Sequence, residues 1–346
     1  MNFDAITIRD IARELQLSVS TVSKALRDSY EISEKTKKLV LEYAKENNYR
    51  PNPMAQSLKK GHSKSIGIVV SSIDNQFFSQ VINGMESEAY SQGYNVIITQ
   101  SHESYDLEVQ NVSHLIHRAI DGLLISIATE TADVEHLRRL QQQGLPIVFF
   151  DRVSSEIDTH KVIVDNLGGS YQATIHLIDS GYKNIAHITS SVTSSVTTQR
   201  LSGYVQALVE RGIEVNDQYI KYCAHGGLNL EELEQAVDEL LQSSTPPDAI
   251  LTASDRITTS TMTLLHKKNI RIPQDVALVG FSNTVLADVL NPSLTSVHQP
   301  AFEIGKKATE MLLSIINSKR PVTEFENVIL PTELFIRNSS LKVAPE

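Results

Sequence analysis

Small and cationic side chains gather near the N-terminus in an order that suits contact with DNA. They lie in the segment TIRDIARELQLSVSTVSKAL and comprise Val19, Ser20, Thr21, Ser23 and Lys24. Hydroxyl and ammonium groups form hydrogen bonds with bases and phosphates. If a helix presented these side chains outward, they could enter a major groove.

Two short helices around a tight turn are predicted to position this group. The apolar residues of the first helix recur at i, i+3, i+4 and i+7, as Ile8, Ile11, Ala12 and Leu15. Thr7 with Asp10 three residues later matches a capping box that begins this helix. Ser18 is the expected N-cap of the second helix, whose inward stripe is Val22, Ala25 and Leu26. The pattern is typical of a helix-turn-helix.

A small helical bundle that only caps a larger protein would show the same periodicity and capping. Charge separates the two interpretations. Residues 1–64 hold 12 Lys and Arg against 8 Asp and Glu, a net charge of +4. The remaining residues have a net charge of −14, which gives −10 for the whole chain. Because affinity for DNA depends on neutralised phosphates, an acidic chain must concentrate its cations where the duplex lies. This distribution favours DNA binding over the bundle.

The whole chain has the composition of a soluble protein of two or three domains. Of its 346 residues, 41% are hydrophobic and 21% are charged. The start MNFDAITIRD lacks the basic and apolar pattern of a secretory signal, and no later stretch reaches the ~20 apolar residues of a membrane span, so we expect a cytoplasmic protein without membrane contact. The single cysteine, Cys223, excludes an internal disulfide and a cysteine-rich zinc site. Its expected role is that of a small buried residue.

Beyond residue 64 the chain alternates short β-branched runs with helical stretches, which predicts α/β lobes of doubly wound parallel sheets. The expected strands are 66–70, 95–99, 122–127, 146–150, 161–164, 185–189, 248–251 and 276–280. Helices should stop at Gly93, Gly144, Gly181 and Gly212. We expect two lobes with a ligand between them, at the carboxyl ends of the strands.

Residues 51–64, PNPMAQSLKKGHSK, join the helical segment to the first strand. Asn52 and Pro53 can begin a helix of a turn or two, which is marginal in water until something packs against it. We hypothesise that two copies fold together on DNA, with Leu58 wedged into the minor groove and Lys59, Lys60 and Lys64 near phosphates. A flexible basic linker with Leu58 idle is the alternative.

With these pieces in place, the chain resembles the lactose/galactose-repressor family of bacterial transcription regulators over nearly its whole length. The motifs stand in the family's order: TIRDIARELQLSVSTVSKALRD, YRPNPMAQSLKKGHSKSIGIVV, PIVFFDR, VDNLGGS, RLSGY, IPQDVALVGFSN, PSLTSVHQP and LPTELFIRNSS. The resemblance implies an allosteric repressor, homodimeric or tetrameric, with a periplasmic-binding-protein-like core. Since no heptad run follows LPTELFIRNSS, we expect a dimer.

The resemblance also implies a division of the chain. The expected parts are a helix-turn-helix head (1–50), a hinge helix and linker (51–64) and a two-lobed core (65–340), with lobe 1 at about 65–160 and 292–322 and lobe 2 at about 161–291 and 323–340. Carried over by position, Val19, Ser20 and Lys24 would face bases, Thr7, Ser18, Thr21 and Ser23 would contact phosphates, and Leu58 would be the wedge. Lys24 is the candidate for a strong contact to guanine acceptors.

By the same resemblance, residues of both lobes would line an effector cleft. Lobe 1 would contribute Asp74, Asn75, Phe77, Phe78, Asp151 and Arg152, and lobe 2 would contribute Arg200, Asp255, Ser282 and Asn283. Phe77 and Phe78 are adjacent, so one of them could belong to the core instead. Where the family commonly has an acidic residue after GF, this chain has Ser282. That departure argues against a simple hexose as the effector and leaves open a different sugar, a phosphorylated or acidic sugar, or another metabolite.

Two other functions compete with a repressor. An enzyme is disfavoured because the chain lacks the G-x-G-x-x-G, P-loop, G-x-S-x-G and H-E-x-x-H motifs, and no cofactor or metal is expected. A free-standing solute receptor would not carry a DNA-reading head. The mechanism we expect is a population shift, in which an effector changes the lobes and thereby the affinity of a homodimer for a palindromic operator. Both inducer and corepressor action fit this mechanism.

Overall fold

The computed structural model describes residues 6–49 and 62–342. The chain forms two compact units, Met1–Ser63 and Lys64–Glu346, here called the head and the core. Among the described helices, none combines the length and the apolar content needed to cross a lipid bilayer.

Three helices make up the described part of the head: α1 (Ile8–Glu14), α2 (Val19–Ala25) and α3 (Glu34–Glu46). Ile11, Val22, Ala25 and Val40 are fully buried where these helices meet. The predicted capping box is confirmed, because Thr7 accepts from the Asp10 backbone N–H and Asp10 accepts from that of Thr7. Ser18 caps α2, as predicted, and Ser33 caps α3 in the same way. The two predicted helices of the helix-turn-helix therefore form as expected.

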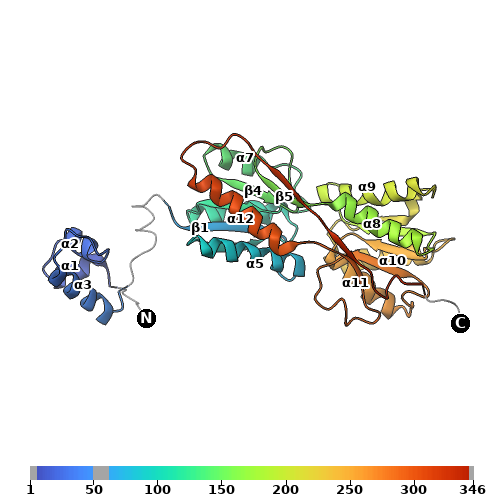
Figure 1. Ribbon diagram of the computed structural model, residues 1–346, viewed down its shortest axis with the longest axis horizontal. Helices are drawn as coiled ribbons and strands as arrows, with labels where there is room; N and C mark the ends of the chain where they lie inside the picture. The colour runs from blue at the N-terminus through green and yellow to red at the C-terminus, as the bar shows by residue number, and fades with distance from the viewer. Residues whose placement is uncertain (1–5, 50–61, 343–346) are drawn as a thin grey trace. The chain divides into compact units, whose positions relative to one another are not determined.

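The core contains two six-stranded sheets, each at the centre of one lobe (Figure 1). Sheet 1 has the order β11-β5-β4-β3-β1-β2, and all its pairs are parallel. Its strands are β1 (Ser65–Val70), β2 (Asn95–Gln100), β3 (Gly122–Ile125), β4 (Ile147–Phe150), β5 (Lys161–Val164) and β11 (Asn327–Leu330). Sheet 2 has the order β12-β10-β9-β8-β6-β7, in which only β12 runs antiparallel. Its strands are β6 (Ile185–Thr189), β7 (Ile220–Tyr222), β8 (Ala249–Thr252), β9 (Ala277–Phe281), β10 (Thr295–His298) and β12 (Glu333–Phe335).

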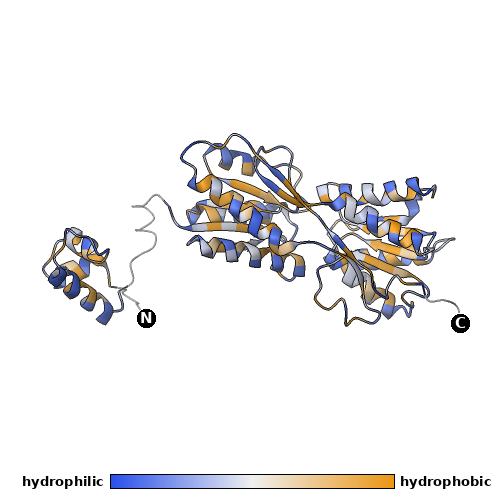
Figure 2. Cartoon of the chain, viewed as in Figure 1, coloured by the Kyte–Doolittle hydropathy of each residue, from blue (hydrophilic) through white to orange (hydrophobic). Residues whose placement is uncertain are grey.

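Helices cover both faces of each sheet, which confirms the doubly wound fold. In lobe 1, α5 (Gln76–Ser91) and α12 (Ala301–Asn317) cover one face, and α6 (Tyr105–His117) and α7 (Glu135–Gln142) cover the other. In lobe 2 the pairs are α8 (Asn166–Asp179) with α9 (Ser195–Glu210), and α10 (Leu230–Leu241) with α11 (Asp255–Lys267). A short 3-10 helix spans Asp217–Tyr219. The hydrophobic residues concentrate in the strands and on the inner helix faces (Figure 2).

All eight predicted strands are present, with ends that differ by at most two residues. The four glycines expected to stop helices have φ between +67° and +94°, a region that side chains disfavour. Four further strands, β7, β10, β11 and β12, were not predicted; each has only three or four residues.

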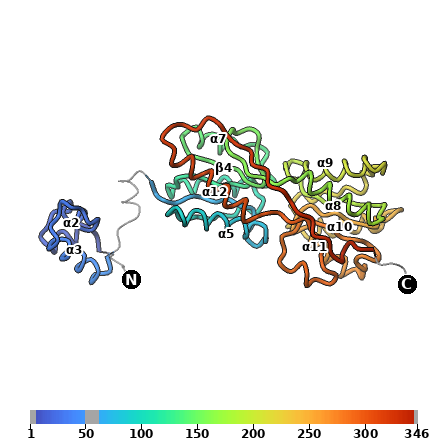
Figure 3. The backbone as a smooth tube through the Cα atoms, in the orientation of Figure 1, coloured from blue at the N-terminus to red at the C-terminus, as the bar shows by residue number. Residues whose placement is uncertain are grey.

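The expected boundaries between the lobes differ from the observed ones, because the chain passes between the sheets near its end. β5, expected in lobe 2, pairs with β4 and β11 in sheet 1. β10, expected in lobe 1, pairs with β9 in sheet 2, and β11, expected in lobe 2, pairs in sheet 1. The tube in Figure 3 shows this late part of the chain passing from one lobe to the other. Strand hydrogen bonding therefore assigns lobe 1 residues 64–164 and 301–330, and lobe 2 most of the remaining core.

Two helices of lobe 1 that are distant in sequence, α5 and α12, pack closely against each other (Figure 1). A glycine from each helix lies at the crossing. A Cβ on Gly84 would collide with the backbone oxygen of Phe302, and a Cβ on Gly305 would collide with that of Val81. The two backbones can approach this closely because neither glycine has a side chain.

Candidate nucleic-acid interface and effector cleft

The outer face of α2 presents the side chains predicted to meet DNA. Val19 is 44% exposed, although it is apolar, and Ser18 and Ser20 are exposed as well. Thr21, Ser23 and Lys24 are half-buried, whereas Val22 and Ala25 point into the core of the head. The helix therefore separates an inner apolar stripe from an outer polar face, as its sequence predicts.

Several of these polar side chains already have partners within the head. The Ser18 Oγ accepts from the Thr21 backbone N–H at 3.0 Å and lies 2.8 Å from the Thr21 Oγ1. Thr7 uses its hydroxyl in the capping box of α1. Lys24 forms an ion pair with Glu31, which lies in the loop between α2 and α3. Leu58 and Lys59, the expected wedge and its neighbour, lie outside the described residues.

In the core, a pocket lies between the lobes at the carboxyl ends of the strands. Seven of the ten residues predicted to contact an effector line it, namely Asn75, Phe77, Phe78, Asp151, Arg152, Arg200 and Asp255. Both aromatic rings reach it, although each is at least 96% buried and they pack edge to face with centroids 5.2 Å apart. Asn75 caps α5 through its side chain. The lobe 2 wall also includes Ser194, at the N-terminus of α9.

Arg200 projects from α9 and is 3% exposed. Its guanidinium donates to the Asn166 Oδ1 at 2.8 Å and to the Gln299 Oε1 at 2.7 Å, and it also donates to the backbone oxygen of Ala253. The group lies over the Phe281 ring, 3.7 Å from the centroid. Burial lowers the pKa of Arg200 to about 9, although the charge of Asp151 opposes this shift. A guanidinium has five N–H groups, so donors remain for a ligand.

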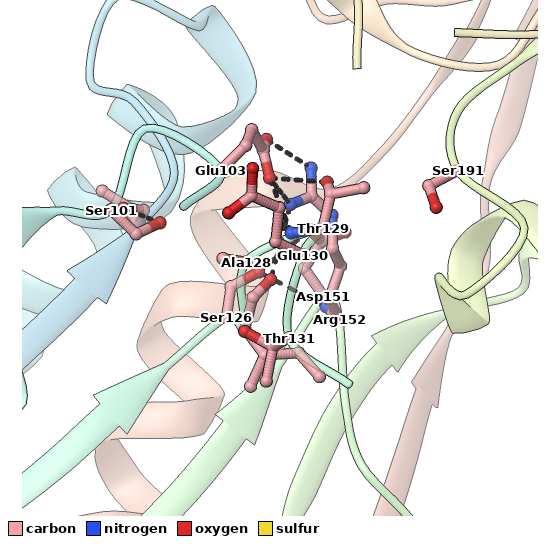
Figure 4. Close-up of polar contacts among 12 residues, drawn as sticks. Ser101, Glu103, Ser126, Ala128, Thr129, Glu130, Thr131, Asp151, Arg152 and Ser191 are labelled. Carbon is pink, nitrogen blue, oxygen red and sulfur yellow. Dashed lines mark hydrogen bonds and ion pairs between the residues drawn. The ribbon is translucent and has the colours of Figure 1, made fainter. Parts of the chain in front are cut away.

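Asp151 and Arg152 directly follow β4 in lobe 1, on the wall opposite Arg200 (Figure 4). Asp151 has a φ of +58°, which is unusual for a residue with a side chain. Burial raises the pKa of its carboxyl, which accepts from the Ser126 Oγ at 3.3 Å. Arg152 forms a two-pronged ion pair with Glu103, with distances of 2.5 and 3.0 Å. Burial alone would raise the pKa of Glu103, but Arg152 and the hydrogen bonds from Thr129 hold it at about 2. Glu103 is therefore ionised.

The remaining lobe 2 residues support the pocket in different ways. Asp255 begins α11 and accepts from the Ser282 hydroxyl. Burial raises the pKa of Asp255, while the hydrogen bond from Ser282 acts against that shift. Ser282 and Asn283, both predicted contacts, do not line the pocket. Asn283 instead forms hydrogen bonds with the Gln299 backbone, at 2.7 and 3.1 Å.

Asp74, also predicted as a contact, lies outside the pocket lining and joins the two lobes instead. The Arg256 guanidinium of lobe 2 donates to its carboxylate at 2.6 Å. The hydrogen bond from Ser72 lowers the pKa of Asp74, and Arg256 lowers it further. Beside this ion pair, the Asn283 Nδ2 donates to the Gln80 Oε1 at 2.8 Å. Polar contacts therefore hold the start of α5 against lobe 2.

Sequence reasoning missed several residues that shape the pocket. Glu103 pairs with Arg152, and Thr129 donates to Glu103; both residues follow strand ends but belong to none of the quoted motifs. Gln299 follows β10, a strand that was not predicted, and Asn166 begins α8. Within residues 6–49 and 62–342, no group of three His, Cys, Asp or Glu is arranged to hold a metal ion.

Comparisons with known proteins agree with this geometry. Residues 63–338 match the family described as periplasmic binding proteins and sugar binding domain of LacI family, and residues 7–52 match the bacterial regulatory proteins of the lacI family. The ribose operon repressor of Haemophilus influenzae is 33% identical over 96% of this chain and 98% of its own length. A transcriptional regulator, CelR, in complex with cellobiose is 26% identical with a TM-score of 0.71, over 96% of this chain and 99% of that one. The lac repressor dimer bound to operator and the anti-inducer ONPF superposes with a TM-score of 0.80 at 23% identity, covering 98% of this chain and all of that chain.

Proposed function

Because the chain belongs to the LacI family of bacterial regulatory proteins, we propose that it is a transcriptional repressor that binds an operator through its head and a small metabolite between its lobes. Relatives with this architecture are DNA-binding repressors, such as the ribose operon repressor. The proposed partners are double-stranded DNA, one effector per chain and a second copy of the chain.

The observation that carries the proposal for the core is the convergence of buried charged groups from both lobes on one pocket. Asp151 comes from lobe 1, whereas Arg200 and Asp255 come from lobe 2. Each is at least 91% buried, yet none forms an ion pair within hydrogen-bonding distance among the described residues. Desolvating such groups costs free energy, which a ligand rich in hydrogen-bonding groups offsets. The pocket therefore suits a ligand more than it suits a structural core.

We propose a sugar or sugar derivative as the effector. Carboxyl and guanidinium groups together match vicinal hydroxyls, which both donate and accept, and the rings of Phe77 and Phe78 can cover apolar ring faces. The CelR structure holds cellobiose, and another family regulator, from Enterococcus faecium, holds ribose. The Ser282 hydroxyl donates to Asp255, and Ser282 does not line the pocket. The acidic residue that commonly stands at this position in the family, and that could bind two sugar hydroxyls, is therefore absent here.

Effector binding would act on DNA affinity by favouring one arrangement of the lobes. A ligand that contacts Asp151 on one wall and Arg200 on the other binds best when the lobes are at one particular separation. It shifts the population toward that arrangement by its difference in affinity, which for such systems is about 1–3 kcal/mol. We propose that two heads in a dimer then gain or lose the spacing of the operator half-sites. As a DNA-binding regulator the protein would act in the cytoplasm, without turning over its effector.

A thermal-shift screen of sugars, sugar phosphates and nucleobases tests the proposal for the core. A ligand of the pocket raises the melting temperature by mass action, with a rise that grows with concentration. Asp255→Asn retains the shape of the side chain but changes its hydrogen bonding, so it should reduce the shift. Asp217→Asn, at an exposed site of the same lobe, should not. Equal shifts in both variants would contradict the pocket as the effector site.

The head is tested by selecting duplexes from a random library with the full chain. A repressor enriches a palindromic sequence and binds it with strong salt dependence. A receptor without DNA function would enrich none. Sedimentation of the chain with the selected duplex should give two copies per palindrome.

A further inference from the structure

The head contains an ion pair that links the predicted base-reading lysine to a carboxylate. The Lys24 Nζ contacts the Glu31 Oε2, and the side chains are 38% and 45% exposed. Lys24 is in the last turn of α2, and Glu31 lies in the loop that follows it. An ammonium group has three donors and a carboxylate has two acceptor oxygens, so both groups can form further hydrogen bonds.

Glu31 differs in this respect from two neighbouring acids, Asp28 of the same loop and Glu34, the first residue of α3. Asp28 and Glu34 both pair with Lys37 of α3, at 2.8 Å each. The Asp28 and Glu34 side chains are 85% and 88% exposed, but their carboxylates pair with Lys37 of α3 and with no side chain of α2 in the described part of the head. Of the three acids, Glu31 alone contacts the outer face of α2 in the described part of the head. When the outer face of α2 contacts DNA, the Glu31 carboxylate therefore lies at the interface beside Lys24.

A G·C base pair offers a matching set of groups in the major groove. Guanine presents the O6 and N7 acceptors, and cytosine presents the N4 donor. Lysine pairs with the guanine acceptors and glutamate accepts from the cytosine amine. We propose that Lys24 and Glu31 together read one G·C pair in each operator half-site, so that Glu31 determines specificity. This inference rests on the proposed binding of an operator by the head.

The carboxylate also discriminates against other sequences. Where no cytosine amine faces Glu31, its charge lies in the negative field of the duplex without a donor, and Lys24 retains Glu31 as its partner instead of a base. Binding to such DNA is weakened by repulsion and by the loss of one neutralised phosphate or base contact. Glu31 thus increases the difference in affinity between operator and random DNA in two ways: it binds the cytosine amine in the operator, and it weakens binding to sequences that lack this amine at that position.

Glu31→Gln tests the inference because it removes the charge but retains the size of the side chain. Duplexes are selected with the full-length wild-type chain, and each base pair of the selected half-site is then varied in binding assays. We expect the wild type to prefer one G·C pair and the variant to reduce that preference by about five- to tenfold, while its affinity for random competitor DNA rises. Glu42→Gln, which removes an exposed charge on α3, is the matched control and should leave both unchanged.

The variant Lys24→Gln and the double variant show whether the two residues act as a unit. If they do, the effect of Glu31→Gln on the G·C preference largely disappears when Lys24 is already replaced. A uniform gain in affinity for all sequences, with the base preference intact, would overturn the inference and leave Glu31 as a counter-charge only. If the wild type itself enriches no sequence, the proposed operator binding fails, an outcome that is distinct from failure at one base pair.

Discussion

His187 lies in the middle of β6, with its side chain fully buried. Its ring stacks on Tyr204 with centroids 5.1 Å apart, and its Nδ1 donates to the Leu251 backbone oxygen at 3.2 Å. The Nε2 has no hydrogen-bond partner among the described residues. Burial lowers the pKa of His187 to about 4, so the imidazole is neutral in the folded protein at neutral pH.

The burial of His187 makes the free energy of unfolding depend on pH. Between pH 6.5 and pH 4 the unfolded chain binds a proton at His187 and the folded chain does not, so the stabilising contribution is present above pH 6.5 and is lost as the pH falls toward 4. The loss amounts to about 3 kcal/mol at about 1.4 kcal/mol per pKa unit. In urea titrations at several pH values, His187→Gln should flatten this part of the stability curve. His266→Gln, at an exposed site, should follow the wild type, and parallel curves for all three proteins would contradict the assignment.

The sequence predicted the positions of some pocket residues correctly, misplaced one and missed others. Arg200 lies in the quoted motif RLSGY and Asp255 was assigned from the resemblance alone, and both line the pocket. Asp74 was placed in the pocket but pairs with Arg256 outside its lining, because its side chain can reach the other lobe. Glu103 was missed, since the Arg152 that it holds is 49 residues away and no local pattern records such a pair. The sequence pattern indicates which residues follow the end of a strand. Partners that are distant in sequence can be identified only from the folded structure.

At the scale of elements, the crossing of α5 and α12 is the most constrained contact of lobe 1. Gly84→Ala and Gly305→Ala should each force the helices apart, because the added methyl meets backbone oxygen that cannot rotate away. We expect each to cost about 1–3 kcal/mol or more, as overpacking does. Gly93→Ala offers a comparison, since it has open space but a φ of +73° and therefore tests backbone strain alone. Melting temperatures measure all three, and tolerance of alanine at both crossing glycines would contradict the packing.

Composition, more than length, separates the predicted strands from the missed ones, since β3, β4, β5 and β8 are also only four residues long. The eight predicted strands are runs of β-branched and apolar residues, and all except β2, whose residues are half-buried or exposed, are largely buried. β11 alternates half-buried and exposed residues over four positions, and β12 has three residues. Such segments become strands only because a sheet edge is available to pair with them. The lobe boundaries at residues 292 and 323 were misplaced because β10 and β11 were not predicted. The boundary at 161 was misplaced because the sequence of the predicted strand β5 does not show which sheet it joins.

At the scale of the whole core, polar contacts join the lobes beside the pocket. The Asp74–Arg256 ion pair and the Gln80–Asn283 hydrogen bond connect lobe 1 with lobe 2. The Asp74 side chain is 64% exposed, so the pair is screened by salt and contributes at most about 1 kcal/mol. That contribution is enough to change the populations of two lobe arrangements several-fold.

Arg256→Gln should therefore shift the core toward a more open arrangement. Small-angle X-ray scattering of the ligand-free chain should show a larger radius of gyration, and the ligand found by thermal shift should bind about two- to fivefold more weakly. Arg271→Gln removes an exposed ion pair within lobe 2 and is the matched control. High salt should reproduce the effect in the wild type. An unchanged radius and affinity in Arg256→Gln would show that the ion pair has no influence on the lobes.

The late passage of the chain between the sheets constrains how such a regulator can diversify. Because β10, β11 and β12 belong alternately to sheet 2, sheet 1 and sheet 2, neither lobe is one continuous stretch of the gene. A single recombination between two related genes within residues 165–326 would join β11 or β12 from one parent to a sheet evolved in the other. Chimaeras that exchange lobe 2 intact must carry both of its segments, whereas the head, which is continuous, can be exchanged with one junction near residue 63. New operators can thus be acquired by shuffling, and new effectors chiefly by point substitution.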